Sequence, residues 1–145
     1  MPGQVEVRYQ SLGECLIVRV AGDVDSSGAQ ILRDSLIAKV SAREARMVVD
    51  LSRVGGMDPT GISALLAGQQ EAEASGGSLR VVGVGPSVRT ALETTDKADA
   101  LMVDDDLSDA LEATMEAAKV ARMSRLPRQS TAADFSTASR DRRQR

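Results

Sequence analysis

The fold of this chain is decided by residues 48–66, which read VVDLSRVGGMDPTGISALL. The β-branched residues at the start predict a buried strand, and Gly55 with Gly56 predicts a turn that ends it. A short polar hinge follows, and apolar residues recur at helical spacing from Ile62 onward. Thr60 stands where the hinge becomes the helix, so we expect its hydroxyl beside free backbone N–H groups at the positive end of the helix dipole.

The composition indicates one aliphatic domain that lacks several residue types used in catalysis. The chain has 145 residues, 42% of them hydrophobic and 1% aromatic, and this length is typical of a single domain. There is no histidine, which removes the commonest general base and the commonest metal ligand. So few aromatic rings argue against stacking on single-stranded nucleic acid. We therefore expect no enzymatic activity, no cofactor, no metal and no direct nucleic-acid contact.

The chain has one cysteine and no recognisable targeting segment. Cys15 lies in an apolar run, cannot form an intrachain disulfide, and is expected to be a small buried hydrophobe. Residues 5–9 already alternate between apolar and polar types, which is unlike a signal peptide. No apolar run approaches the roughly 20 residues that cross a bilayer. These features predict a cytoplasmic protein that makes no membrane contact.

Apolar periodicity along the chain predicts two opening strands followed by alternating helices and strands. Strands that are joined through helices favour parallel pairing with right-handed crossovers. The sequence therefore predicts an α/β fold with a small mixed β-sheet of about five strands, covered mainly on one face by about four helices. The predicted strands cover residues 5–9, 15–21, 46–51, 79–84 and 101–103, and the predicted helices begin near residues 29, 60, 87 and 107.

The C-terminal part of the chain differs from the rest in charge and pattern. From Arg122 onward there are seven arginines and two aspartates, a local net charge of +5, whereas the remainder carries −8. Pro127 breaks any continuing helix, and Phe135 is the only large apolar side chain after Leu126. Such a segment buries too little apolar surface to offset its ordering entropy. We predict a domain over residues 1–121 and a basic, disordered, solvated tail over residues 122–145.

Four segments of the chain together match a known family pattern. Residues 22–25 (GDVD) are similar to its Gly-x-hydrophobic-Asp corner, and residues 48–54 are similar to its central strand and following turn. Residues 57–66 resemble the Asp-Ser-Ser/Thr-Gly-Leu segment that holds a phosphorylated hydroxyl, and residues 76–88 also fit. Over roughly residues 5–121 the chain resembles a STAS domain, in particular a stand-alone anti-sigma factor antagonist of bacteria.

This resemblance implies a binding module in a phosphorylation switch. The unmodified antagonist would bind an anti-sigma factor that is also a serine/threonine protein kinase, and so free a sigma factor for stress-responsive transcription. Phosphorylation at Thr60 would release that partner, and a metal-dependent phosphatase of the PP2C type would restore binding. The protein itself would carry no catalytic activity in this cycle. The resemblance assigns the partner contacts to Asp25, Asp58, Pro59, Gly61 and Ser63.

Two departures from the family pattern lie beside the predicted acceptor. Pro59 replaces the usual first small hydroxyl residue, and Thr60 replaces the commoner serine. Pro59 suits an early helical position and should stiffen the hinge. The alternative role of Thr60 is a plain helix cap, worth roughly 0.5–2 kcal/mol. Asp25 has the same alternative at the first helix, and Ser63 is either a secondary acceptor or a solvated helix residue.

The sequence leaves other functions and other motif interpretations open. A STAS protein could instead be a scaffold or sensor subunit of a larger signalling assembly, or bind a small ligand such as a lipid or nucleotide. Residues 83–85 (GVG) lack the full dinucleotide fingerprint and are expected to form a turn. Residues 104–106 (DDD) are expected to cap the last helix rather than bind a cation. Asp25 and Asp58 are expected to be neighbours across two strand ends.

Overall fold

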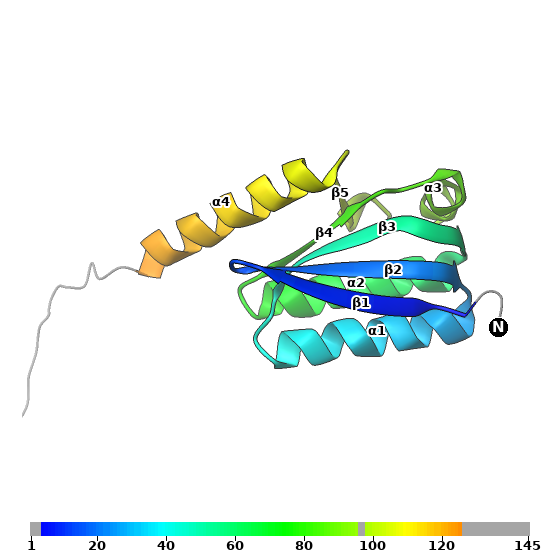
Figure 1. The fold of residues 1–145 in the computed structure, drawn as a ribbon, viewed down its shortest axis with the longest axis horizontal. Coiled ribbons are helices and arrows are strands. Elements are labelled where there is room, and N and C mark those ends of the chain that lie inside the picture. The colour runs from blue at the N-terminus through cyan, green and yellow to red at the C-terminus, as the bar shows by residue number, and fades with distance from the viewer. Residues whose placement is uncertain (1–3, 96–97, 126–145) are drawn as a thin grey trace, which may run out of the picture.

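The computed structural model describes residues 4–95 and 98–125, and Figure 1 shows one sheet with helices on both of its faces. The strands are β1 (Glu6–Leu12), β2 (Cys15–Val24), β3 (Arg46–Met57), β4 (Ser78–Val82) and β5 (Met102–Val103). The helices are α1 (Ser26–Ser41), α2 (Pro59–Ala74), α3 (Pro86–Glu93) and α4 (Leu107–Arg125), with a short 3-10 helix, η1, at Ala98–Ala100.

The strands lie in the sheet in their sequence order, β1-β2-β3-β4-β5. β1 and β2 form the predicted antiparallel hairpin, and the other neighbours pair in parallel. Each parallel crossover contains a helix, because parallel neighbours cannot be joined by a tight turn. The prediction of an α/β fold with a mixed five-stranded sheet and four helices is therefore confirmed.

The helices are divided unequally between the two faces of the sheet. The larger core contains Met47, Val49 and Leu51 of β3 together with apolar residues of α1, α2 and α3. The smaller core contains Val48 of β3 and lies under α4. Adjacent β3 residues enter different cores because side chains alternate along a strand. One face is thus covered by three helices, and part of the other face is covered by α4 alone (Figure 1).

β3 is longer than the sequence pattern predicts, and the predicted glycine turn is wrong. The strand continues through Gly55 and Gly56 to Met57. A Cβ built on Gly55 would lie 2.9 Å from Asp23 Oδ1 on β2, which is closer than real Cβ contacts. Gly55 therefore leaves room for the Asp23 side chain of the neighbouring strand, and both glycines continue β3 instead of reversing the chain.

Side chains anchor the short edge strand β5. Gln69 of α2 is only 4% exposed. Its Nε2 donates to Ala100 O at 2.5 Å, and its Oε1 accepts from Met102 N at 3.2 Å. Arg80 of β4 donates to Asp104 through Nε at 2.6 Å. This hydrogen bond raises the pKa of the Arg80 guanidinium.

Cys15 and the aspartate cluster occupy the places that the sequence predicts for them. Cys15 is 2% exposed at the start of β2, and burial raises the pKa of its thiol. Asp106 caps α4, because its Oδ1 accepts a hydrogen bond from Asp109 N at 2.9 Å. Within the described residues no group of acidic, histidine or cysteine side chains is arranged to hold a metal ion.

α4 continues to Arg125, four residues beyond the predicted domain boundary at residue 121. Arg122 forms an ion pair with Glu14, which lies in the turn between β1 and β2. No helix in the described part of the chain is both long and apolar enough to cross a membrane. Most of the predicted basic tail, residues 126–145, lies outside the described residues.

Candidate functional site

Asp25 and Asp58 stand at equivalent positions, each directly after a strand of one parallel pair. β2 and β3 end with Val24 opposite Met57. The Asp58 N–H donates to Val24 O at 3.2 Å, which extends the pairing by one residue. The carboxyl ends of parallel strands meet at one edge of a sheet, so the two aspartates are brought to the same edge. The predicted proximity of Asp25 and Asp58 is confirmed.

Asp25 is the N-cap of α1, and the capping role weighed from the sequence is confirmed. Its backbone is extended, with φ −90° and ψ −168°. Its Oδ1 accepts from Gly28 N at 2.9 Å, which satisfies one of the free N–H groups at the helix start. The Asp25 side chain is also exposed, so the cap lies on the surface that begins at this strand edge.

The corresponding cap of α2 is Asp58, and the interpretation of Thr60 as the cap is wrong. Asp58 has φ −97° and ψ 175°, Pro59 follows inside the first turn, and Thr60 is the second residue of the helix. Asp58 Oδ1 accepts from Thr60 N at 3.0 Å. The fixed φ of proline suits the first helical position, which moves the cap to the residue before it.

Thr60 is an exposed residue, and its hydroxyl group is held by the same carboxylate. Its Oγ1 donates to Asp58 Oδ1, the oxygen that also accepts from the Thr60 N–H. One carboxylate oxygen therefore fixes both the backbone and the side chain of Thr60. Thr60 as a whole is exposed to solvent.

Thr60 and Ser63 line a shallow depression of about 250 Å³ between the first turns of α1 and α2. Ser63 is exposed, one turn further along α2. From α1 the depression receives Gln30 and Arg33, which the sequence reading missed. Both lie on the exposed side of α1. The sequence carries no local signal for this placement, because it depends on the packing of α1 against α2.

Gly61 is buried, and its lack of a side chain places the first turn of α2 against the strand ends. A Cβ built on Gly61 would lie 2.5 Å from Met57 Cγ and 3.0 Å from Val24 Cγ1. Any side chain here would push the helix start away from the sheet. Gly61 therefore positions Thr60, whereas Thr60 and Ser63 offer the exposed polar atoms.

Pro59 lines a second depression, on the side of α3. The second depression is about 460 Å³ and is lined by Pro59, Pro86, Thr90 and neighbouring residues. Pro59 is exposed and, unlike Thr60 and Ser63, lines this second depression. The site residues predicted from the sequence thus gather at one end of the α1–α2 layer.

Comparison with known proteins identifies the family. A family model described as "Mlab, STAS domain" matches residues 7–104. An anti-sigma factor antagonist from Mycobacterium paratuberculosis is 25% identical, with a TM-score of 0.70 over 79% of this chain and 97% of that chain. A putative anti-sigma factor antagonist from Thermotoga maritima is 16% identical, with a TM-score of 0.66 over 75% and 94%.

A third solved structure is the anti-sigma factor antagonist SpoIIAA in its unphosphorylated form. It is 15% identical, with a TM-score of 0.58 over 77% of this chain and 98% of that chain. A comparison with curated protein sequences gives no significant match. Because the family model spans more than half of the chain and the described fold agrees with the solved structures, the chain belongs to the STAS-domain family.

Proposed function

We propose that this protein is an anti-sigma factor antagonist that binds an anti-sigma factor with serine/threonine kinase activity. Phosphorylation of Thr60 releases that partner, and a PP2C-type phosphatase reverses the modification. The observation that carries this proposal is the exposed Thr60 hydroxyl, held at the start of α2 by Asp58. It is supported by likeness to an anti-sigma factor antagonist and by the phosphorylated and unphosphorylated structures of SpoIIAA.

The position of Thr60 lets a phosphate join the protein without unfolding it. A phosphate adds about −1.5 to −2 charges, and the N-terminus of a helix attracts anions. Thr60 is exposed, so the modified side chain stays in solvent. The main consequence is therefore at the surface, where the contact with a partner is made.

Phosphorylation also reverses the charge of the depression between α1 and α2. Arg33 is its only charged lining residue among those described, and Gln30, Thr60 and Ser63 are neutral. A dianion on Thr60 outweighs one arginine and lies beside the Asp58 carboxylate. It also removes the hydroxyl proton that Thr60 gives to Asp58. A tenfold loss of affinity needs only ~1.4 kcal/mol, which repulsion in a desolvated interface can supply.

The proposal is tested by affinity capture with unmodified protein, Thr60→Ala and Thr60→Glu, followed by phosphosite mapping after incubation with ATP. Wild type and Thr60→Ala should recover a kinase-type partner, and Thr60→Glu should recover much less. Phosphate should map to Thr60 in the wild type. The matched control is Ser108→Ala, at an exposed hydroxyl on α4 outside the depression, which should recover the partner and still be phosphorylated at Thr60. Equal recovery by all variants would refute the switch.

A further inference from the structure

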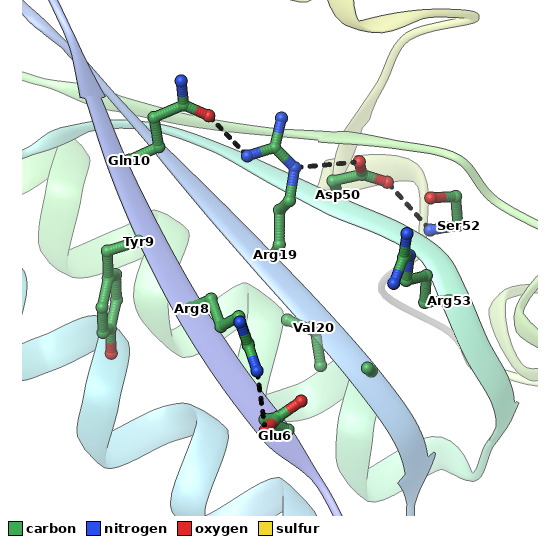
Figure 2. Close-up of a pocket in the computed structure, with 10 residues that line it drawn as sticks. Glu6, Arg8, Tyr9, Gln10, Arg19, Val20, Asp50, Ser52 and Arg53 are labelled. Atoms are coloured by element: carbon green, nitrogen blue, oxygen red, sulfur yellow. Dashed lines mark hydrogen bonds and ion pairs between the residues drawn. The ribbon is translucent and has the colours of Figure 1, made fainter.

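A groove of about 710 Å³ lies on the sheet face that is turned away from α1 and α2. α4 covers the β3–β4 side of this face, and the groove lies over β1, β2 and β3 (Figure 2). Three strands each contribute one arginine to its lining, namely Arg8, Arg19 and Arg53. Its volume falls in the range of roughly 300–1,000 Å³ that is typical of small-molecule sites.

A bulge in β3 turns Arg53 into this groove. Arg19 pairs with Asp50, but Ala21, two residues further along β2, pairs with Arg53, three residues further along β3. The extra residue breaks the alternation, so that consecutive Ser52 and Arg53 both line the groove. In a regular strand they would point to opposite faces. Bulges of this kind re-aim single side chains beside functional sites.

Arg19 is held in place at the centre of the groove. Its Nη1 donates to Gln10 Oε1 at 2.5 Å, and its Nε lies 3.9 Å from Asp50 Oδ2. Asp50 is itself fixed, because its Oδ1 accepts from Ser52 N at 2.9 Å. Neighbouring strands on both sides therefore hold the guanidinium (Figure 2), which lowers the entropy cost of binding a ligand.

Two of the positive charges in the groove destabilise the sheet. Arg8 lies directly opposite Arg19 in the β1–β2 pairing, and like charges at such positions are destabilising. Among the described residues, Arg8 has one ion pair, with Glu6 at 3.4 Å, in which the side chains are 75% and 61% exposed. Exposed pairs of this kind contribute little. The repulsion between Arg8 and Arg19 does not stabilise the sheet. Binding of an anionic ligand by these arginines would explain why both are present.

Arg53 adds a third positive charge to the groove. Among the residues that the structure describes, no carboxylate forms an ion pair with it, and its side chain is exposed. The groove thus contains three guanidinium groups against the two carboxylates of Glu6 and Asp50. Arginine forks match the oxygens of phosphates and carboxylates in a bidentate manner.

We propose that this groove binds a small molecule with two adjacent anionic groups, either phosphates or carboxylates. One group is held by Arg19 and the second by Arg53 across the small side chain of Ala21, while Arg8 adds positive charge on the β1 side of the groove. The groove and the Thr60 surface lie on opposite faces of the sheet, so a ligand here leaves the α1–α2 surface free. The groove would therefore be a second binding site, and ligand binding there would not depend on phosphorylation of Thr60.

Calorimetric titration of the full chain at constant ionic strength tests this proposal. The probes are pyrophosphate and citrate, with sulfate as a probe that carries a single anionic group. Wild type should bind pyrophosphate or citrate at least about tenfold more tightly than sulfate. The tighter of the two probes identifies the ligand as a phosphate or a carboxylate compound. Thr60→Ala should bind like wild type, which separates this result from the outcome for the proposed function.

Two groove variants and one matched control make the test specific. Arg53→Gln and Arg19→Gln should each weaken binding of the tighter probe by about tenfold or more. Arg53→Gln removes no ion pair among the described residues, so it should fold normally even if Arg19→Gln is destabilised. The control is Arg89→Gln on α3, outside the groove, which should leave binding unchanged. Failure of wild type to bind either probe, or equal binding by Arg53→Gln, would overturn the proposal.

Discussion

Thr60 donates both its backbone N–H and its hydroxyl hydrogen to one oxygen, Oδ1 of Asp58. The same carboxylate is the N-cap of α2. The proposed phosphoacceptor and the cap of its helix are thus two hydrogen-bonded residues on either side of Pro59. Any modification of the hydroxyl must change the environment of the cap, which links the chemical state of Thr60 to the start of the helix.

Removal of the Asp58 side chain should destabilise the protein through the loss of this cap. Asp58→Ala should lower the free energy of unfolding by about 0.5–2 kcal/mol, whereas Asp58→Asn should retain most of it because asparagine is also a good N-cap. Urea denaturation followed by circular dichroism measures the difference. Equal stability of wild type and Asp58→Ala would show that the carboxylate does not hold the helix start.

A methyl group at residue 61 should disturb the site from within the core. Gly61→Ala should cost about 1–3 kcal/mol, because its Cβ would overlap Met57 and crowd Val24. It should also displace Thr60 and reduce partner recovery. Gly56→Ala is the matched control, since its Cβ would lie at an ordinary 3.6 Å from Asp23 Oδ1. If both alanine variants unfold at the same urea concentration as wild type, the close packing at Gly61 is not needed.

The buried amide of Gln69 should control the stability of the β5 edge. Gln69→Ala removes the partners of Ala100 O and Met102 N, and the loss should cost about 1–3 kcal/mol. Amide hydrogen exchange at Met102 should become faster. The control is the exposed neighbour in Gln70→Ala, which should leave both measurements unchanged. Unaltered exchange at Met102 in Gln69→Ala would contradict this role.

Cys15 should react with thiol reagents only after the protein opens. The side chain is 2% exposed and burial raises its pKa, so the reactive thiolate is both scarce and inaccessible near neutral pH. Labelling with iodoacetamide should be slow in buffer and complete in urea. Rapid, complete labelling of the native protein would mean that β2 is not packed as described.

Hydrophobic periodicity was sufficient to predict the order of elements, because it depends on local alternation along the chain. The prediction of a glycine turn was wrong because a contact between two strands, which the local sequence does not show, decides the role of these glycines. Gly55 and Gly56 are ordinary turn residues in isolation, but here both lie within β3, and Gly55 leaves room for the Asp23 side chain on β2. The register that creates this contact involves residues about thirty positions apart, and no local pattern records it.

The positions of Asp58, Pro59 and Thr60 in the fold were predicted more completely than their hydrogen bonds. The motif placed Asp58, Pro59 and Thr60 at a helix start, but threonine and aspartate are both capping residues. The preference of proline for the first helical position already indicated Asp58 as the cap. Arg33 and the groove with Arg53 could not be anticipated in the same way, since they depend on helix packing and on a bulge set by strand register.

The central claim is tested most directly by the affinity of one partner for two forms of this chain. The partner recovered with unmodified protein is titrated with unmodified protein and with protein phosphorylated at Thr60. The account predicts a dissociation constant at least about tenfold higher for the phosphorylated form, equivalent to ~1.4 kcal/mol, with both forms equally folded. Equal dissociation constants for the two forms would contradict it.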